Sequence, residues 1–304
     1  MRQTAAIVVT YNRKELLEEN IKALLKQTFQ DFDIMIIDNA STDGTKDVVD
    51  KYKNDRIIYY NTGENIGGAG GFNFGLKKSI LMGYTYGWLM DDDTIPTEKA
   101  LCSLIRKAQL LNDEFSFLSS IVLWNDGKIC EMNRQRLTVN ALDGYQAIKD
   151  GLLLCNHASF VSYFVNLRVA EKVGLPIKDF FIYADDWEYS VRLVSHRQAY
   201  VDTDSIVIHK MKNNTAGDLV AVERERIPRY YYDHRNAFYV NRRLGKRYLV
   251  RYLVYSVMKM ATIVRKSPDC KLERICIMIK GLCAGIFFNP EIEYVRSPNT
   301  EERL

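Results

Sequence analysis

Residues 86–93 read Tyr-Gly-Trp-Leu-Met-Asp-Asp-Asp, a short apolar strand that runs directly into three carboxylates. Carboxylates this close repel one another, so at least one is driven toward its neutral form unless positive charge lies among them. A divalent cation that prefers oxygen ligands would supply that charge, and it would in turn hold a diphosphate. The competing interpretation is a solvated acidic turn, because a lone Asp-x-Asp is a weak signal.

Apolar strands and helical patterns alternate along the residues that precede this motif. Strands are expected at 5–10, 34–38, 56–60 and 87–90, and helices at 14–28, 41–53 and, after a glycine-rich loop, up to about residue 81. This alternation predicts an α/β domain with a largely parallel sheet. The middle of the chain is less regular, with strands expected at 118–124, 159–166, 199–201 and 206–208 and a helix at 185–196.

Polar side chains gather where the first four expected strands end. They are Thr10, Tyr11, Asn12, Arg13, Asp38, Asn39, Asn65, Asp91, Asp92 and Asp93. Ligands of open α/β sheets bind at the carboxyl ends of the strands. The sequence therefore predicts one binding site at this edge of the sheet.

Composition places the chain among globular proteins, with 47% hydrophobic and 26% charged residues in 304. The six cysteines have no metal-binding or Cys-x-x-Cys spacing, so we expect reduced thiols and a cytoplasmic protein. The apolar run at the start is too short for a signal peptide, and no apolar run reaches the ~20 residues of a spanning helix.

Basic residues are concentrated near the C-terminus. Between Arg235 and Lys280 there are twelve Lys and Arg residues against Asp269 and Glu273, a net charge of +10 within a total of +4. Arg247–Lys266 has a helical pattern with a narrow polar stripe, and 272–288 is again mostly apolar. Residues 236–304 are therefore expected to be a helical, basic, amphipathic region that packs on protein, as in an oligomer, or lies on an anionic membrane surface; we favour the membrane.

The glycine-rich segment is Asn65-Ile-Gly-Gly-Ala-Gly-Gly-Phe-Asn-Phe-Gly75. It lacks the Lys-Ser/Thr of a P-loop, and its spacing is not that of the dinucleotide fingerprint. Glycines before a helix, here Gly67 and Gly68, let backbone N–H groups approach a phosphate. A plain flexible turn is the alternative.

A second acidic cluster lies at Asp185-Asp-Trp-Glu188. Carboxylates at a helix N-terminus are stabilised by its dipole, but capping needs only one of them. A second carboxylate with Trp187 and Glu188 indicates a site that offers an aromatic platform, acceptors for hydroxyl groups and a general base. His209 ends a later strand and is either a structural histidine or the third ligand of a metal site begun by Asp91 and Asp93.

The order of these motifs resembles that of family 2 glycosyltransferases with the GT-A fold. The matching segments are 8–13, 36–45, 65–75, 90–93, 185–188, His209 and 230–236, so the resemblance covers roughly residues 5–240. The glycine-rich segment is most similar to that of galactofuranosyltransferases, whereas rhamnosyltransferases usually have fewer glycines there. The resemblance implies a Rossmann-like GT-A catalytic domain over residues 1–235.

The resemblance also implies a role for each site residue. Donor-binding residues would be Thr10, Tyr11, Arg13, Asp38, Asn65, Gly67, Gly68, Asp91 and Asp92, with Asp38 accepting from a uracil N–H. Asp91, Asp93 and His209 would bind Mn²⁺ or Mg²⁺. Asp186 would be the base that deprotonates the acceptor hydroxyl, and Asp185, Trp187 and Glu188 would position the acceptor.

Galactofuranosyltransferases that extend the mycobacterial polymer are much longer and have an N-terminal β-rich domain, whereas the motifs here begin close to Met1. We therefore expect an inverting hexosyltransferase that makes a single linkage in surface polysaccharide synthesis, such as O antigen or capsule. It would transfer galactofuranose from UDP-galactofuranose to a lipid-linked oligosaccharide at the inner face of the cell membrane. The alternatives are a rhamnosyltransferase that uses a dTDP-sugar and a non-catalytic protein that binds nucleotide sugars. No nucleic-acid partner is expected.

Overall fold

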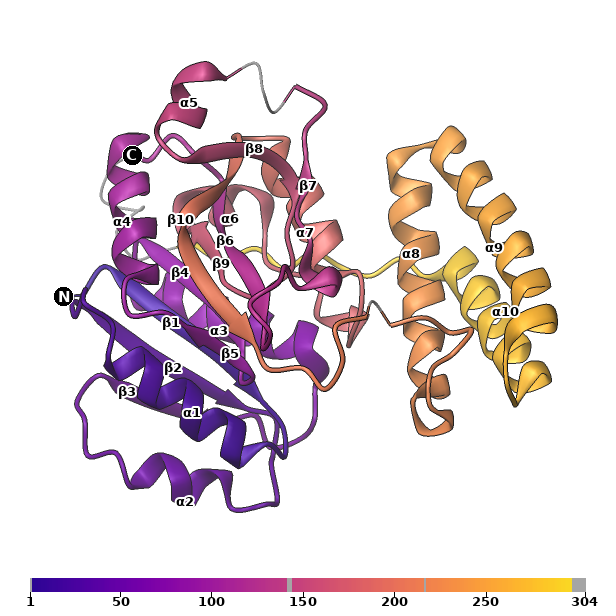
Figure 1. Cartoon of the computed structure of the whole chain (residues 1–304), viewed down its shortest axis with the longest axis horizontal. Coiled ribbons are helices and arrows are strands. Elements are labelled where there is room, and N and C mark those ends of the chain that lie inside the picture. The colour runs from indigo at the N-terminus through magenta and orange to yellow at the C-terminus, as the bar shows by residue number, and fades with distance from the viewer. Residues whose placement is uncertain (1, 141–143, 216, 297–304) are drawn as a thin grey trace.

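The computed structural model of the protein describes residues 2–140, 144–215 and 217–296. Its centre is a ten-stranded sheet with the order β3-β2-β1-β4-β9-β6-β10-β8-β7, and β5 pairs with β10 (Figure 1). The strands span Thr4–Thr10 (β1), Phe32–Asp38 (β2), Ile57–Asn61 (β3), Tyr86–Asp91 (β4), Thr94–Pro96 (β5), Phe117–Trp124 (β6), Arg136–Leu137 (β7), Leu152–His157 (β8), Tyr163–Asn166 (β9) and Ala199–His209 (β10). The predicted α/β class is confirmed.

The first four strands of the chain are parallel, as the sequence predicts. The sheet then becomes mixed, because β9 runs antiparallel between β4 and β6. β1 and β2 are buried along their whole lengths, as expected for strands covered on both faces. Two clusters of buried apolar side chains fill the space between the sheet and its helices.

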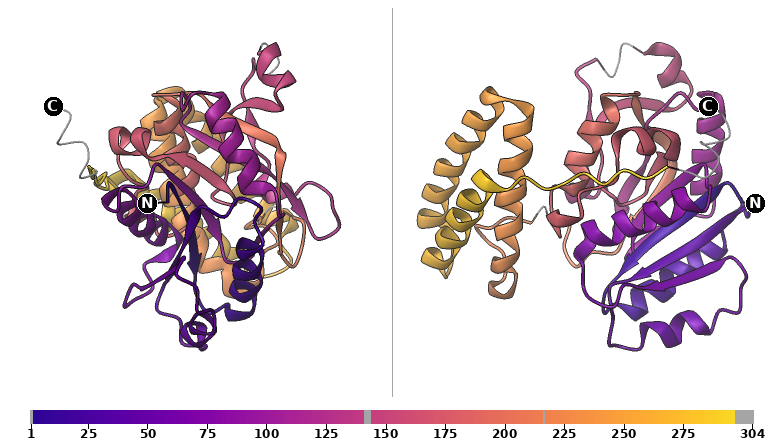
Figure 2. Two further views of the ribbon diagram at one scale, coloured as in Figure 1. Left: turned by 90° about the vertical axis from the view of Figure 1, so that its left-hand side faces the viewer. Right: turned by 180° about the vertical axis from the view of Figure 1, so that it is seen from behind.

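The helices of this domain pack on both faces of the sheet (Figures 1 and 2). They span Lys14–Leu25 (α1), Thr45–Asp50 (α2), Gly67–Leu81 (α3), Ala100–Leu110 (α4), Tyr145–Lys149 (α5), Leu167–Val173 (α6) and Asp185–Val194 (α7). Helix α2 is shorter than the predicted 41–53, because Gly44 adopts a left-handed conformation (φ +87°) immediately before it. Ser41 instead accepts a hydrogen bond from the backbone N–H of Asn12.

The glycine-rich segment is helical for most of its length and is not the predicted loop. Helix α3 begins at Gly67 and lies against β1. A Cβ on Gly71 would meet Val9 Cγ1 at 2.6 Å, and one on Gly75 would meet Ile7 Cγ2 at 2.4 Å. The glycines therefore let the helix approach the strand closely, which loop flexibility does not explain.

The later strands also differ from the predictions. β10 is one strand over Ala199–His209 where the sequence predicts two, and a register shift between Asp202 and Ile206 marks the break in its pattern. β9 covers only the second half of the predicted 159–166.

Three C-terminal helices form a separate layer away from the sheet (Figures 1 and 2). They span Tyr230–Leu244 (α8), Lys246–Lys266 (α9) and Lys271–Phe287 (α10), so the predicted boundary after residue 235 falls inside α8. None of the described helices is long and apolar enough to cross a bilayer. After α10 the chain returns to the sheet domain, where the Leu175 N–H donates to the Glu293 carbonyl at 2.8 Å and Lys77 pairs with the Glu293 carboxylate at 2.5 Å.

Candidate active site

The three carboxylates lie at the turn between β4 and β5. The short β5 then pairs with the end of β10, and this pairing places Thr94 opposite His209. Asp92 and Asp93 are buried, with exposed fractions of 3% and 6%, and Asp91 is partly buried. The sheet therefore joins the end of β4 to a histidine 116 residues from Asp93 along the chain.

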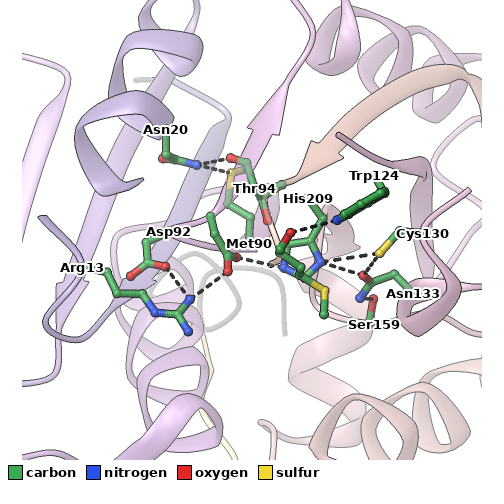
Figure 3. Close-up of polar contacts among 12 residues, drawn as sticks. Arg13, Asn20, Met90, Asp92, Thr94, Trp124, Cys130, Asn133, Ser159 and His209 are labelled. Carbon is green, nitrogen blue, oxygen red and sulfur yellow. Dashed lines mark hydrogen bonds and ion pairs between the residues drawn. The ribbon is translucent and has the colours of Figure 1, made fainter. Parts of the chain in front are cut away.

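Asp91, Asp93 and His209 have one ligand atom each within 4.8 Å of the others. The His209 ring lies between Asp93 Oδ1, 2.9 Å from its Nε2, and Asn133 Oδ1, 2.7 Å from its Nδ1 (Figure 3). Two carboxylates and an imidazole whose far nitrogen is held by another side chain fit a divalent cation. This grouping is the one that the sequence predicts for the metal.

Charge in this cluster is out of balance without a cation. Burial and the neighbouring Asp93 raise the pKa of Asp91 to about 7. Burial also raises the pKa of Asp92 to about 6 against the opposing charge of Arg13. Burial disfavours the His209 cation, but the hydrogen bond to Asp93 outweighs it and raises the pKa of His209 to about 10. These shifts are those of an anionic cluster that favours added positive charge.

Arg13 and Thr10 connect the end of β1 to the carboxylates. Figure 3 shows Arg13 beside Asp92. Arg13 Nη1 lies 2.8 Å from Asp93 Oδ2 and 3.4 Å from Asp92 Oδ1, and Thr10 Oγ1 donates to Asp92 Oδ2 at 2.7 Å. The Arg13 side chain is 44% exposed, so its guanidinium can also meet a ligand.

The end of β2 places another carboxylate, that of Asp38, at this edge of the sheet. Asp38 is buried and accepts from the Ser41 N–H at 2.8 Å and from the Tyr59 hydroxyl at 2.6 Å. Each carboxylate oxygen keeps a further lone pair, which a base N–H could use. Tyr11 is 44% exposed at the same edge of the sheet.

The N-terminus of α3 faces this edge. The Gly67 N–H donates to Asn65 Oδ1 at 2.9 Å, and Asn39 donates to the Gly67 carbonyl at 3.0 Å. Gly67 has φ +74°, and a Cβ there would lie 2.1 Å from the Phe181 carbonyl oxygen. A Cβ on Gly68 would meet nothing within 4 Å, so the space beside this residue is open to a ligand.

The second acidic cluster lies at the start of α7 and close to the first. Burial raises the pKa of Asp185 well above its usual value, and the charges of Asp186 and Asp91 raise it further. Asp186 lines a cavity of about 400 Å³ together with Trp187. Its Oδ1 lies 3.7 Å from His157 Nε2.

Glu188 lies in the same first turn of α7 but does not line this cavity, although the sequence predicts that it contacts the acceptor. It is buried in a two-point ion pair with Arg192, with Nε–Oε1 at 2.8 Å and Nη2–Oε2 at 2.7 Å. Arg192 also donates to the carbonyls of Val173 and Leu175. Glu188 is not among the residues that line the cavity, and its contacts are those of a structural ion pair.

Residues 5–152 match the family model described as Glycosyl transferase family 2. These residues form a family 2 glycosyltransferase domain. The match includes every residue of the predicted donor site and the predicted metal ligands Asp91 and Asp93. His209, the second acidic cluster and helices α8, α9 and α10 lie beyond it.

Curated relatives are similar to the chain over about a third of its length. The chain is 30% identical over 100 residues to Galactofuranosyltransferase GlfT1 of Mycolicibacterium smegmatis. This alignment covers 33% of each of the two proteins. It is 37% identical over 111 residues to the GalNAc(5)-diNAcBac-PP-undecaprenol beta-1,3-glucosyltransferase of Campylobacter jejuni, which covers 36% of this chain and 35% of that protein. The chain thus matches about a third of the length of each relative.

A solved structure shows the fold beyond the matched segment. Mannosyltransferase PcManGT from Pyrobaculum calidifontis, in complex with GDP-Man and Mn²⁺, superposes with a TM-score of 0.55 at 14% identity. The superposition covers 94% of this chain and 76% of that one. The GT-A fold that the resemblance implies is therefore confirmed.

Several residues around the family 2 domain's site carry no signal in the sequence. Asn133 lies in an irregular segment and reaches His209 only through the fold. His157 ends a strand that the sequence does not predict, although its position next to Asp186 depends on that strand. The first part of helix α8 lies in the resembling region, where the sequence has a run of tyrosines at 230–232.

Proposed function

We propose that this protein is a metal-dependent, inverting glycosyltransferase. The observation that supports this most is the placement of two acidic clusters side by side, one with a histidine ligand and one open to a cavity. Glycosyl transfer needs one set of groups to stabilise the leaving diphosphate and another to deprotonate the attacking hydroxyl at the same anomeric carbon. Asp91, Asp93 and His209 would serve the leaving group, and Asp186 would serve the nucleophile.

In the reaction, the acceptor hydroxyl gives its proton to Asp186 while its oxygen bonds to the anomeric carbon of the donor sugar. The bond from that carbon to the diphosphate oxygen breaks, and its electron pair leaves with the nucleoside diphosphate. Attack on the face opposite the leaving group inverts the anomeric centre. Arg13 would hold the departing diphosphate, and a divalent cation at the metal ligands would supply further positive charge to it.

For the donor we propose UDP-galactofuranose, bound by Thr10, Tyr11, Arg13, Asp38, Asn65, Gly67, Gly68, Asp91 and Asp92. The galactofuranosyltransferase relative and the glycine-rich start of α3 support this sugar. UDP-glucose is a second candidate, because a relative of 37% identity is a glucosyltransferase. A panel of UDP-galactofuranose, UDP-glucose and dTDP-rhamnose with Mn²⁺ and alkyl-diphosphate-linked acceptors tests the choice. Release of UDP from UDP-glucose alone would exclude galactofuranose.

Asp186→Asn is the test of the proposed base. The amide cannot accept the hydroxyl proton, so we expect transfer to fall by at least 10²-fold, the lower end of general-base catalysis. UDP affinity should be unchanged, since Asp186 belongs to the other cluster. Transfer at the wild-type rate in this variant would remove Asp186 from the reaction.

For the acceptor we propose a lipid-linked oligosaccharide at an anionic membrane surface. The Campylobacter relative is named for an undecaprenol-linked substrate. Helix α9, on the side away from the sheet, exposes both apolar and basic side chains. Peripheral association through this helix would bring the enzyme to the cytoplasmic face, where such acceptors are made.

A further inference from the structure

Helices that lie outside the family match form part of the wall of the cavity at Asp186. On one side it is lined by Asp186 and Trp187 of α7, with His157 and Arg136 from the neighbouring strands. On the other side it is lined by residues of α8 and α9. These are Tyr230, Asp233, His234, Ala237, Tyr252, Tyr255 and Lys259. The sheet domain therefore supplies only part of the wall around the proposed base.

The helical side of the cavity holds buried polar groups. His234 is 4% exposed, its Nδ1 lies 3.0 Å from the Tyr252 hydroxyl, and its Nε2 has no partner among the described residues. Asp233 precedes it, and burial raises the pKa of its carboxyl to about 6. An unpaired buried nitrogen and an enclosed carboxyl cost free energy that a packed apolar wall would not. Groups of this kind are enriched at functional sites.

The charges of the cavity favour a neutral ligand over a phosphate. Lys259 is already paired with Asp218, with 2.5 Å between Nζ and Oδ1, and Arg136 lies over the Trp187 ring at 5.8 Å. The carboxylates of Asp186 and Asp233 both line the same space and would repel an anion. The mixture of hydrogen-bonding groups with tyrosine and tryptophan rings suits a hydroxylated ring with one apolar face.

We propose that this cavity binds the acceptor sugar, and that Tyr255, Asp233 and Lys259 of α8 and α9 determine which sugar presents its hydroxyl to Asp186. This inference rests on the proposed function. The volume of about 400 Å³ lies in the usual range of small-ligand sites and can hold a monosaccharide. Tyr255 is 52% exposed and stands at the rim, next to the exposed apolar residues of α9. A lipid-linked acceptor could enter there with its lipid toward the membrane.

Helix α9 offers a matched pair of tyrosines for the test. Tyr255 lines the cavity, whereas Tyr248 on the same helix does not, and their exposed fractions are close at 52% and 47%. With alkyl-diphosphate-linked sugars as acceptors, Tyr255→Ala should raise the acceptor KM about tenfold or more, and Tyr248→Ala should leave it at the wild-type value. Asp233→Asn, which keeps the shape of the side chain, should also raise the acceptor KM. The Kd for UDP with Mn²⁺ should be the same in all four proteins.

Equal acceptor KM values in the Tyr255 and Tyr248 variants would overturn the inference. A second measurement separates this outcome from failure of the proposed function. Methyl glycosides of galactose, N-acetylglucosamine and rhamnose are tested for binding by saturation-transfer NMR in the presence of UDP and Mn²⁺. Binding to the wild type that Tyr255→Ala abolishes supports the cavity even if no donor is turned over. No binding of any glycoside contradicts it.

Discussion

Asn133 is not one of the proposed metal ligands, but it holds the side chain of one of them, His209. The imidazole must point Nε2 at the cation, and the contact between Nδ1 and Asn133 Oδ1 at 2.7 Å fixes the ring in that orientation. Asn133 in turn donates to Ser159 Oγ at 2.8 Å, so its own amide is held (Figure 3). Partners of this kind commonly contribute 10- to 100-fold in metal affinity.

We therefore expect Asn133→Ala to weaken Mn²⁺ binding by about 10- to 100-fold, without loss of the fold. Calorimetric titration of Mn²⁺ in the presence of UDP measures the change, and thermal melting checks the fold. Asn125→Ala is the matched control, because Asn125 is exposed and its side chain donates to the Met211 carbonyl at a long distance of 3.5 Å. Equal Mn²⁺ affinity in the two variants would show that Asn133 does not orient the ligand.

The buried carboxyl of Asp233, which lines the cavity at Asp186, should make the free energy of unfolding depend on pH. Burial raises the pKa of its carboxyl from 3.8 to about 6, with Lys259 opposing the shift. Between these values the folded protein holds a proton that the unfolded chain releases, so this residue's contribution to stability is full below pH 4 and is lost as pH rises through 6. Asn cannot ionise. Asp233→Asn should therefore exceed the wild type in unfolding free energy by about 1–3 kcal/mol above pH 6, and by nothing near pH 4.

Chemical denaturation of both proteins at pH 4, 5, 6 and 7.5 measures that difference. A constant difference across the series would contradict the shifted carboxyl. A variant that is more stable at neutral pH and yet binds acceptor less well would also show that its loss of function is not a loss of folding.

At the scale of single residues, the sequence identifies those side chains that local pattern marks. Asp91 and Asp93 follow an apolar strand, and His209 ends another, so their grouping could be predicted. Asn133 and His157 could not, because each is placed by a contact between distant segments that no periodicity records. Glu188 is the converse case, since its neighbours indicate a site while Arg192, one helical turn away, engages it.

At the scale of secondary-structure elements, helices α8 and α10 pack closely together at glycine residues of α10. A Cβ on Gly281 would lie 2.7 Å from the Tyr231 carbonyl oxygen and 2.9 Å from His234 Cβ. Ala normally stabilises a helix over Gly by about 1 kcal/mol. Here the backbone of α8 must move, so we expect Gly281→Ala to destabilise the protein by about 1–3 kcal/mol. The displaced α8 should also raise the acceptor KM.

Thermal melting compares Gly281→Ala with Cys283→Ala, an exposed position on the same helix. The control should melt at or slightly above the wild-type temperature, because alanine favours the helix. A higher melting temperature for Gly281→Ala would mean that the two helices have room to spare at this contact.

Elements with strong periodicity could be predicted, and those set by packing could not. The first four strands and α9 follow from apolar runs and helical spacing. The glycines of α3 suggest a loop by composition, yet they lie in a helix, where they allow close contact with Val9 and Ile7 of β1. The tyrosine-rich α8 lacks an apolar stripe in sequence, because it is covered on several sides by α9, α10 and the sheet domain.

At the scale of the whole molecule, the helical layer has two faces of different composition. Tyr252 and Lys259 of α9 face the cavity at Asp186. The opposite side of α9 exposes apolar residues, among them Val254, Val257 and Met258 with exposed fractions of 55%, 66% and 65%. One helix could thus place the acceptor sugar at the base and hold the enzyme against the surface from which that acceptor projects.

The exposed side of α9 also carries Arg247, Arg251, Arg265 and Lys266, all exposed. Apolar side chains flanked by basic ones match an anionic lipid surface, where each basic residue contributes about 1 kcal/mol. A second copy of this helix would instead bring like charges together. The charge therefore favours a membrane over a dimer as the partner of this face.

Flotation with liposomes tests this face. The wild type should float with vesicles that contain anionic lipid and float much less with purely zwitterionic ones. A triple variant, Val254→Ser, Val257→Ser and Met258→Ser, should stay at the bottom of the gradient with both. Replacing Arg247 and Arg251 by Gln should weaken binding by roughly fivefold for each residue.

The matched control replaces Leu81, Leu110 and Ile129, which are exposed on the sheet domain, by Ser and should float as the wild type does. The membrane proposal is wrong if the triple variant floats as the wild type does. It is also wrong if light scattering shows that the wild type is a dimer and the triple variant a monomer, because the exposed face of α9 would then bind protein.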